Sequence, residues 1–205
     1  MSAALSRAGG RVVGLDGVQE QVGRYEGLGF RRAYLNVRMG GPVTPEVIAS
    51  LRAQSDSQIG VMPYEVGFIH ALERFEEVGP LFPAHRPNFL RAWLGSEGHY
   101  GAVAFKTGIL SGYGVIRPTR RGAFRVGPLF AADARMASAL LVCLLSQVPV
   151  GTTVLIDVPE PNEPAMTLMR SIGLAPVFDC VRMYAGAPPV LDLQRTFAIT
   201  TCEFG

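Results

Sequence analysis

Residues 126–141 read VGPLFAADARMASALL and join a strand, an interruption and a helix in one short stretch. Pro128 has no N–H to donate to a neighbouring strand, so the strand is expected to part from its neighbour at Gly127-Pro128. Asp133 is a suitable N-cap for the following segment, in which apolar side chains recur at helical spacing. The stretch therefore predicts an interrupted strand that leads through a short loop into a capped amphipathic helix.

Hydrophobic periodicity and turn residues divide the rest of the chain into similar short elements. The predicted helices span residues 18–29, 64–78, 86–94, 133–148 and 162–173, and a further short helix is expected within residues 40–60. The predicted strands span residues 11–18, 30–38, 100–105, 109–118, 123–131, 152–158, 175–184 and 195–204. Because strands and helices interleave along the chain, this order predicts an α/β or α+β fold in which helices pack on a mixed sheet.

Composition indicates a globular protein and argues against two kinds of partner. The 205 residues are 48% hydrophobic and carry a formal charge of +2, too small to indicate binding of nucleic acid. No run approaches about 20 apolar residues, so we expect no membrane span, and the N-terminus lacks the apolar core of a secretory signal. The scattered Cys143, Cys180 and Cys202 are typical of buried, reduced thiols, which favours a cytoplasmic protein.

Four pieces of the sequence together resemble the GNAT superfamily of N-acyltransferases. They are VGPLFAADARMASALL, TTVLIDVPEPNEPAM, LMRSIGL and VFDCVRMY, in that order along residues 57–205. The resemblance implies a mixed, mostly antiparallel sheet with flanking helices and splayed central strands, and acetyl-CoA or another acyl-CoA as co-substrate. The segments HRPNFLRAWL, SGYGVIRP, VRMYAG and FAITTCEFG are more narrowly similar to a bacterial subfamily with two GNAT-like units in tandem.

The resemblance also assigns residues to acyl-CoA binding. Backbone groups of the interrupted strand would pair with the pantetheine arm, and N–H groups at the start of the next helix would face the pyrophosphate. Asn162 matches a frequent family asparagine, with simple N-capping as the alternative. The residues implied for the cofactor are Val126, Gly127, Leu129, Phe130, Arg135, Met136, Ala137, Ser138 and Asn162.

Two features depart from the family pattern. In the phosphate loop, Arg135 stands where the first glycine is usual, which hinders close backbone approach, and Asp133 adds a carboxylate nearby. Many family members place a tyrosine four residues before a Gly-Phe corner, where its hydroxyl protonates the leaving thiolate. Here that position is Met169, which cannot donate a proton.

Other polar residues are candidates for the acceptor side of the reaction. Asp157 ends an apolar strand near the expected thioester and would act as a base or orient the substrate, with a turn cap as the alternative. His85 and Arg86 precede a helix at the lip where acceptors usually enter in the family, with a plain surface loop as the alternative. No pair of His, Cys or carboxylate residues has metal-ligand spacing, so we expect no metal. The cluster of Arg117, Arg120 and Arg121 is interpreted as a solvated hairpin tip.

A short stretch near the start of the chain recurs near its end. YEGLGFRRAYLNVRMGG aligns with MRSIGLAPVFDCVRMYA, so that Arg38 falls on Arg182, and upstream, once three residues are gapped, Asp16 falls on Asp157. Recurrence of the arginine favours a structural role in both copies, such as a bond to the sheet edge. The repeat predicts a remnant of a first GNAT-like unit over residues 1–45, a linker over 46–56 and a complete unit over 57–205.

These features predict direct transfer of an acetyl or other acyl group from CoA to an amine, carried by a small molecule or a polypeptide. Two alternatives remain open. One is a catalytically degenerate GNAT-like module that binds acyl-CoA or a partner, and the other is a structural domain in which the N-terminal half-copy docks. The sequence leaves the acceptor, the length of the acyl chain and the formation of a homodimer undecided.

Overall fold

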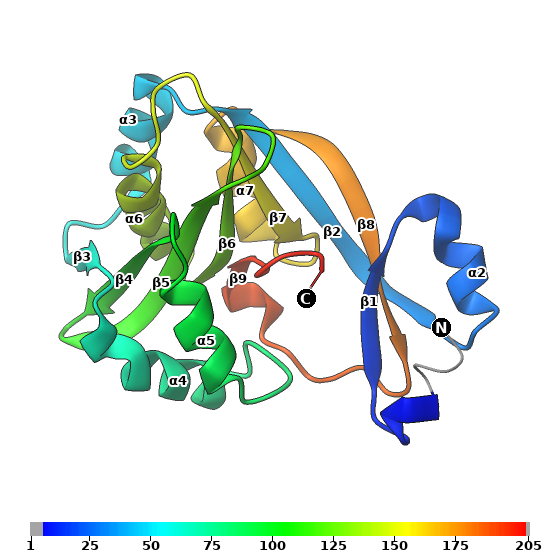
Figure 1. Cartoon of the computed structure of the whole chain (residues 1–205). Coiled ribbons are helices and arrows are strands. Elements are labelled where there is room, and N and C mark those ends of the chain that lie inside the picture. Colours follow the sequence, from blue (N-terminus) through cyan, green and yellow to red (C-terminus); the bar gives the residue numbers. More distant parts are fainter. Residues whose placement is uncertain (1–5, 204–205) are drawn as a thin grey trace.

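The computed structural model describes residues 6–203 and shows a single sheet with helices on both faces (Figure 1). The α-helices are α2 (Val22–Glu26), α3 (Pro45–Gln54), α4 (Ile69–Val78), α5 (Pro87–Leu94), α6 (Ala134–Leu145) and α7 (Glu163–Ser171). The strands are β1 (Val13–Gly17), β2 (Arg31–Pro42), β3 (Ile59–Pro63), β4 (Tyr100–Lys106), β5 (Ile109–Pro118), β6 (Phe124–Ala131), β7 (Thr153–Pro159), β8 (Ala175–Ala185) and β9 (Thr196–Ala198).

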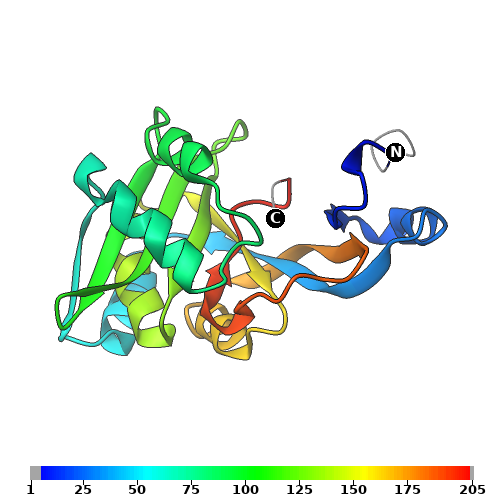
Figure 2. The same cartoon turned by 90° about the horizontal axis from the view of Figure 1, so that it is seen from below.

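Neighbouring strands follow the order β1-β8-β2-β7-β6-β5-β4-β3, and β9 pairs with β6. Among the described strand pairs, β6 and β7 run parallel and the others are antiparallel. Two of the three apolar clusters in the described part of the chain lie on opposite faces of the sheet, and the third joins α2 to β1 and β8. Helices α3, α6 and α7 cover one face, and α4 and α5 cover the other (Figure 2). The predicted mixed, mostly antiparallel sheet with flanking helices is confirmed.

The two copies of the repeat exchange strands in this sheet. In the repeat β1 corresponds to β7 and β2 to β8, yet β1 pairs with β8 and β2 pairs with β7. The register sets Asp16 opposite Arg182 and Asp157 opposite Arg38. Both arginines lie 2.6 Å from the carboxylate that they face. Each recurrent arginine therefore forms an ion pair with the recurrent aspartate of the other copy, a structural contact between strands.

This exchange joins the first 45 residues to the rest of the chain. The neighbours of β8 are β1 and β2, and both come from the N-terminal segment. The interval 46–56, for which a linker with a short helix is predicted, forms most of helix α3, which packs against α6 because Val47 and Leu51 are buried in the main core. The sheet is thus continuous across the expected boundary, and the division of the chain into two units remains a prediction.

Two strands differ from the sequence-based expectation. β3 was not predicted, because it is an edge strand with mostly exposed side chains and shows no strong apolar period. β9 ends at Ala198, before the end of the predicted strand over 195–204, because the Ile199 N–H turns to the Asp157 carbonyl of β7. Over residues 6–203, no helix is long and apolar enough to cross a membrane.

Candidate functional site

A wedge opens between β6 and β7 where the sequence predicts the interruption. The strands pair in parallel from Phe124–Val126 and Val154–Ile156 and then diverge. A cis peptide bond joins Gly127 to Pro128 directly after the last pair. The observed splay is the one that the Gly-Pro pair predicts.

The chain's own C-terminal strand fills this wedge. β9 pairs with β6 at Leu129 and Phe130, and beyond it the Ile199 N–H donates to the Asp157 carbonyl of β7 at 3.0 Å (Figure 1). Phe197, at the centre of β9, has no exposed surface and belongs to the main core. The backbone edge expected to hold pantetheine is therefore paired with protein in this structure.

Two residues predicted to bind the cofactor also fit the C-terminal segment. A Cβ atom at Gly127 would lie 2.5 Å from two carbonyl oxygens, those of Ile199 and Thr200, so only glycine leaves room for the segment. The Asn162 Nδ2 donates to the Thr196 carbonyl at 3.0 Å, and its Oδ1 caps α7 by accepting the Ala165 N–H. Both residues thus have a contact with the protein at the position where a cofactor contact was expected.

The start of α6, expected to face the pyrophosphate, is capped from within. The Asp133 Oδ1 accepts the Met136 N–H at 2.9 Å, which removes one expected anion donor. The Ser138 hydroxyl donates to the Ala134 carbonyl, and Arg135 is exposed beside it. Val126 and Ala137 are fully buried. Binding of acyl-CoA by this set of residues remains a prediction.

The acceptor candidates Arg86 and His85 lie in different environments. Arg86 is buried, and its Nε and Nη2 donate to both carboxylate oxygens of Glu76 at 2.8 and 2.7 Å. Its Nη1 donates to the Thr200 hydroxyl at 3.1 Å, so Arg86 anchors the C-terminal segment. His85 is exposed at the rim of a neighbouring pocket. These contacts give Arg86 a structural partner on each side, and an acceptor contact of either residue remains a prediction.

Asp157 is almost completely buried, and its oxygens have partners. Arg38 donates to both oxygens through Nε and Nη2, at 2.6 and 3.0 Å. The Cys202 thiol lies 3.5 Å from Oδ2, and Arg125 Nη1 lies 3.9 Å from the same oxygen. A general base needs a lone pair within hydrogen-bond reach of the acceptor. The observed contacts suit a positioning role for Asp157, while a role as base remains a prediction.

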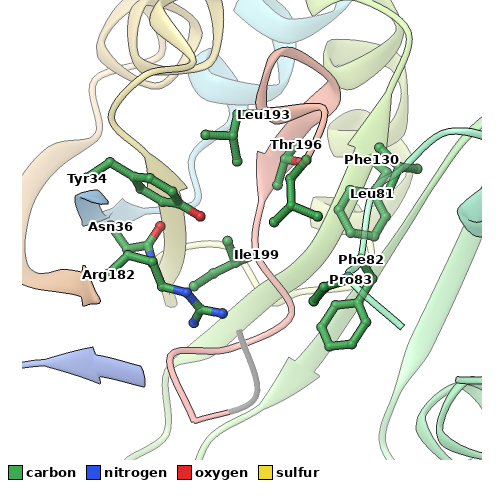
Figure 3. Close-up of a pocket in the computed structure, with 11 residues that line it drawn as sticks. Tyr34, Asn36, Leu81, Phe82, Pro83, Phe130, Arg182, Leu193, Thr196 and Ile199 are labelled. Carbon is green, nitrogen blue, oxygen red and sulfur yellow. The ribbon is translucent and has the colours of Figure 1, made fainter. Parts of the chain in front are cut away.

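A second polar cluster lines a small pocket on the face of β2 and β8 (Figure 3). Tyr34, Asn36 and Arg182 form its polar side, and Asn36 Oδ1 is buried with no hydrogen-bond partner among residues 6–203. The other lining residues are Leu81, Phe82, Pro83, Phe130, Leu191, Leu193, Thr196 and Ile199. The free volume of about 20 Å³ accommodates about one water molecule. No substrate of ordinary size fits while the C-terminal segment lies in place.

Burial shifts the pKa of two groups at this second cluster, namely Asp16, which pairs with Arg182, and Tyr34, which lines the pocket. It raises the pKa of Asp16, although the ion pair with Arg182 and the hydrogen bond from Asn36 oppose the shift. Burial also raises the pKa of Tyr34, with Tyr184 as a further cause. Tyr34 is therefore a neutral phenol at physiological pH.

Sequence reasoning missed the position of one arginine pair in the site. Arg117 was interpreted as part of a solvated hairpin tip, but it is partly buried on the same face as Arg125 and near Asp157. No direct signal was present in the sequence, because a hairpin symmetric about TRRG would set Arg117 opposite Phe124, whereas the observed register sets it opposite Arg125. Arg120 and Arg121, at the turn itself, are exposed as expected.

Known proteins resemble this chain in sequence. A family model described as "Acetyltransferase (GNAT) domain" matches residues 79–198. Holothin acyltransferase of Pseudoalteromonas sp. (strain SANK 73390) is 30% identical over 196 residues, which cover 95% of this chain and 63% of that relative. The chain thus spans less than two thirds of the length of the curated relative that it matches.

Solved structures share the fold at lower identity. A protein of Pyrococcus horikoshii described as an acetyltransferase has a TM-score of 0.69 and 20% identity, over 95% of this chain and 60% of that one. A tandem GNAT protein from the clavulanic acid biosynthesis pathway has a TM-score of 0.55 and 16% identity, over 90% and 68% of the two chains. By the family match and the sequence relative, the chain belongs to the GNAT acetyltransferase family, whose members transfer acyl groups from acyl-CoA to amines.

Proposed function

We propose that the chain acts in N-acyl transfer, in which an amine attacks the thioester carbon of acetyl-CoA directly and CoA leaves as the thiol. The observation that carries this proposal is the divergence of β6 and β7 at Gly127-Pro128, with Asn162 beside it. If β9 is displaced, the diverging strands offer backbone donors and acceptors that suit the amide groups of a pantetheine arm. Direct attack needs no nucleophilic side chain on the protein.

The filled wedge favours a second candidate, in which this unit is a degenerate GNAT-like module that does not hold acyl-CoA. Binding of acyl-CoA along β6 requires β9 to leave, which exposes the buried Phe197 and Ile199. Exposure of two such side chains costs about 5 kcal/mol. The affinity for acyl-CoA would then be roughly three to four orders of magnitude lower than that of an open wedge. The two candidates therefore differ in whether β9 moves.

Hydrogen exchange with added acetyl-CoA separates these candidates. If acetyl-CoA enters the wedge, amide exchange across residues 196–200 should increase, and the thermal midpoint should rise. Release of free thiol with a panel of amines would then report turnover. Binding without thiol release would contradict acyl transfer by this chain with those amines, and the absence of both signals would support the degenerate module that does not hold acyl-CoA.

A single substitution tests whether β9 is the obstacle. Gly127→Ala places a methyl group 2.5 Å from two backbone oxygens of the C-terminal segment and should push it outward. The expected result is tighter binding of acetyl-CoA than in the original chain. Gly60→Ala is the matched control, because its Cβ would meet nothing within 4 Å. Equal affinity in both variants would show that β9 does not limit entry.

The acceptor that we propose is a small-molecule amine. The sequence relative is named for acylation of holothin, and displacement of the C-terminal segment would enlarge the small pocket on the polar face of β2 and β8. We also propose a cytoplasmic location, because Cys143, Cys180 and Cys202 are free thiols, which a reducing compartment maintains. Fractionation of cells that express the tagged chain tests the location.

A further inference from the structure

Two arginines face each other across the hairpin of β5 and β6. The register sets Arg117 directly opposite Arg125, and like charges in that relation destabilise a strand pair. Arg117 Cζ lies 5.0 Å from the ring centre of Trp93, and the Arg125 side chain is only 13% exposed. Solvent therefore screens the two charges only in part, and the arrangement requires negative charge nearby.

The carboxylates near this pair supply that charge incompletely. Asp157 and Glu203 each lie 3.9 Å from Arg125 Nη1, a distance too long for a hydrogen bond. Both oxygens of Asp157 already accept hydrogen bonds from Arg38. Glu203 belongs to the C-terminal segment, and its side chain is 67% exposed. The guanidinium groups of Arg38, Arg117 and Arg125 thus share two carboxylates. One of these, Asp157, is already paired with Arg38.

The arginine pair also has unmet hydrogen-bonding capacity. The Nε atoms of Arg117 and Arg125 are buried and have no hydrogen-bond partner in the described part of the chain. A guanidinium presents donors in a planar fork that matches two oxygens of a carboxylate or phosphate. Burial, and then the charge of Arg125, lower the pKa of Arg117. Both observations are those expected of cations that lack a close counter-ion.

We propose that Arg117 and Arg125 form a binding site for an oxyanion, namely a carboxylate or phosphate group carried by a small ligand. The anion would accept hydrogen bonds from both guanidinium groups, while the Arg38–Asp157 ion pair bounds the site on the side of β7. Glu203 competes for the same positive charge. The site thus has an internal competitor that belongs to the C-terminal segment.

This site lies where a substrate of acyl transfer would approach. Arg125 is within the last paired segment of β6, directly before the wedge opens, and close to Asp157. If the proposed function holds, on which this step rests, the preferred acceptors carry an acidic group beside the amine. Binding of the anion itself does not depend on acyl transfer.

The test is a calorimetric titration of the full chain at constant ionic strength, with inorganic phosphate in one experiment and acetate in another. We expect saturable binding of at least one anion, and preference for one identifies the oxyanion class. Arg125→Gln and Arg117→Gln should each weaken binding at least about tenfold, the effect of losing a charged hydrogen-bond partner. Arg120→Gln, which removes the same charge from the exposed tip of the same hairpin, should leave the affinity unchanged.

A variant that is expected to bind the anion more tightly distinguishes loss of the site from misfolding, because a misfolded chain would not gain affinity. Glu203→Gln removes the internal competitor and should tighten anion binding severalfold. The proposed site would be overturned if anion binding were weaker or unchanged in Glu203→Gln. It would also be overturned if Arg120→Gln lost as much affinity as the other arginine variants, or if phosphate and acetate bound no more tightly than chloride. Thiol release with amines that differ only by a carboxylate tests acceptor selection. If no amine reacts, the proposed function fails while the anion titration still decides the site.

Discussion

Substitution of Phe197 by alanine tests whether β9 is an integral strand of the fold. Phe197 has no exposed surface and packs in the main core between β6 and β7. Truncation of a buried phenylalanine to alanine typically costs about 3–5 kcal/mol, because the transfer free energy is lost and a cavity remains. For a chain of this length, each kcal/mol lowers the thermal midpoint by about 2–4 °C. We therefore expect Phe197→Ala to lower the midpoint by roughly 10 °C.

Urea unfolding followed by tryptophan fluorescence measures this loss close to the wedge. Trp93 is the single tryptophan of the chain, and its Nε1 donates to the Gly127 carbonyl at 3.1 Å. Val190→Ala, at a side chain that is 89% exposed in the loop before β9, is the control and should change stability by less than about 0.5 kcal/mol. A loss below about 1 kcal/mol in Phe197→Ala would refute the reasoning, because it would show that β9 does not pack in the wedge.

Three further substitutions test the interior contacts. Arg38→Ala leaves the buried Asp157 without its ion-pair partner and should cost about 3–5 kcal/mol of unfolding free energy in urea, and a loss under 1 kcal/mol would contradict the ion pair. Met169→Tyr enlarges a side chain with no exposed surface, so we expect a loss of about 1–3 kcal/mol and no gain in thiol release, whereas faster release would indicate a missing acid. Burial, with the charge of Arg117, lowers the pKa of His99 in the folded chain. As the pH falls below about 6.5, His99 therefore takes up a proton more readily in the unfolded chain than in the folded one. The stability of the original chain relative to His99→Gln should therefore fall in that range, and the difference between the two should be constant at higher pH.

Local chemistry made several parts of the structure predictable. Asp133 caps α6 as expected, and the Gly127-Pro128 pair marks the splay, because capping and loss of a ladder N–H depend on residues within a few positions. The pairing of Arg117 with Arg125 was not predictable in this way, because the loop between their strands is one residue longer than the TRRG turn and shifts the register by one position. The buried face of α3 was not predictable, because a short helix with few apolar residues shows that face only when it packs on α6.

The sequence by itself determined the elements, their order and the recurrence of an aspartate and an arginine in two similar segments. Only the tertiary structure decided that the segments exchange strands, so that Asp16 meets Arg182 and Asp157 meets Arg38. Tertiary packing alone also placed β9 in the wedge expected for a cofactor. The physical reason is the same in both cases. Strand partners distant in sequence are selected by the total area buried and the buried charges paired, and no local pattern records that sum.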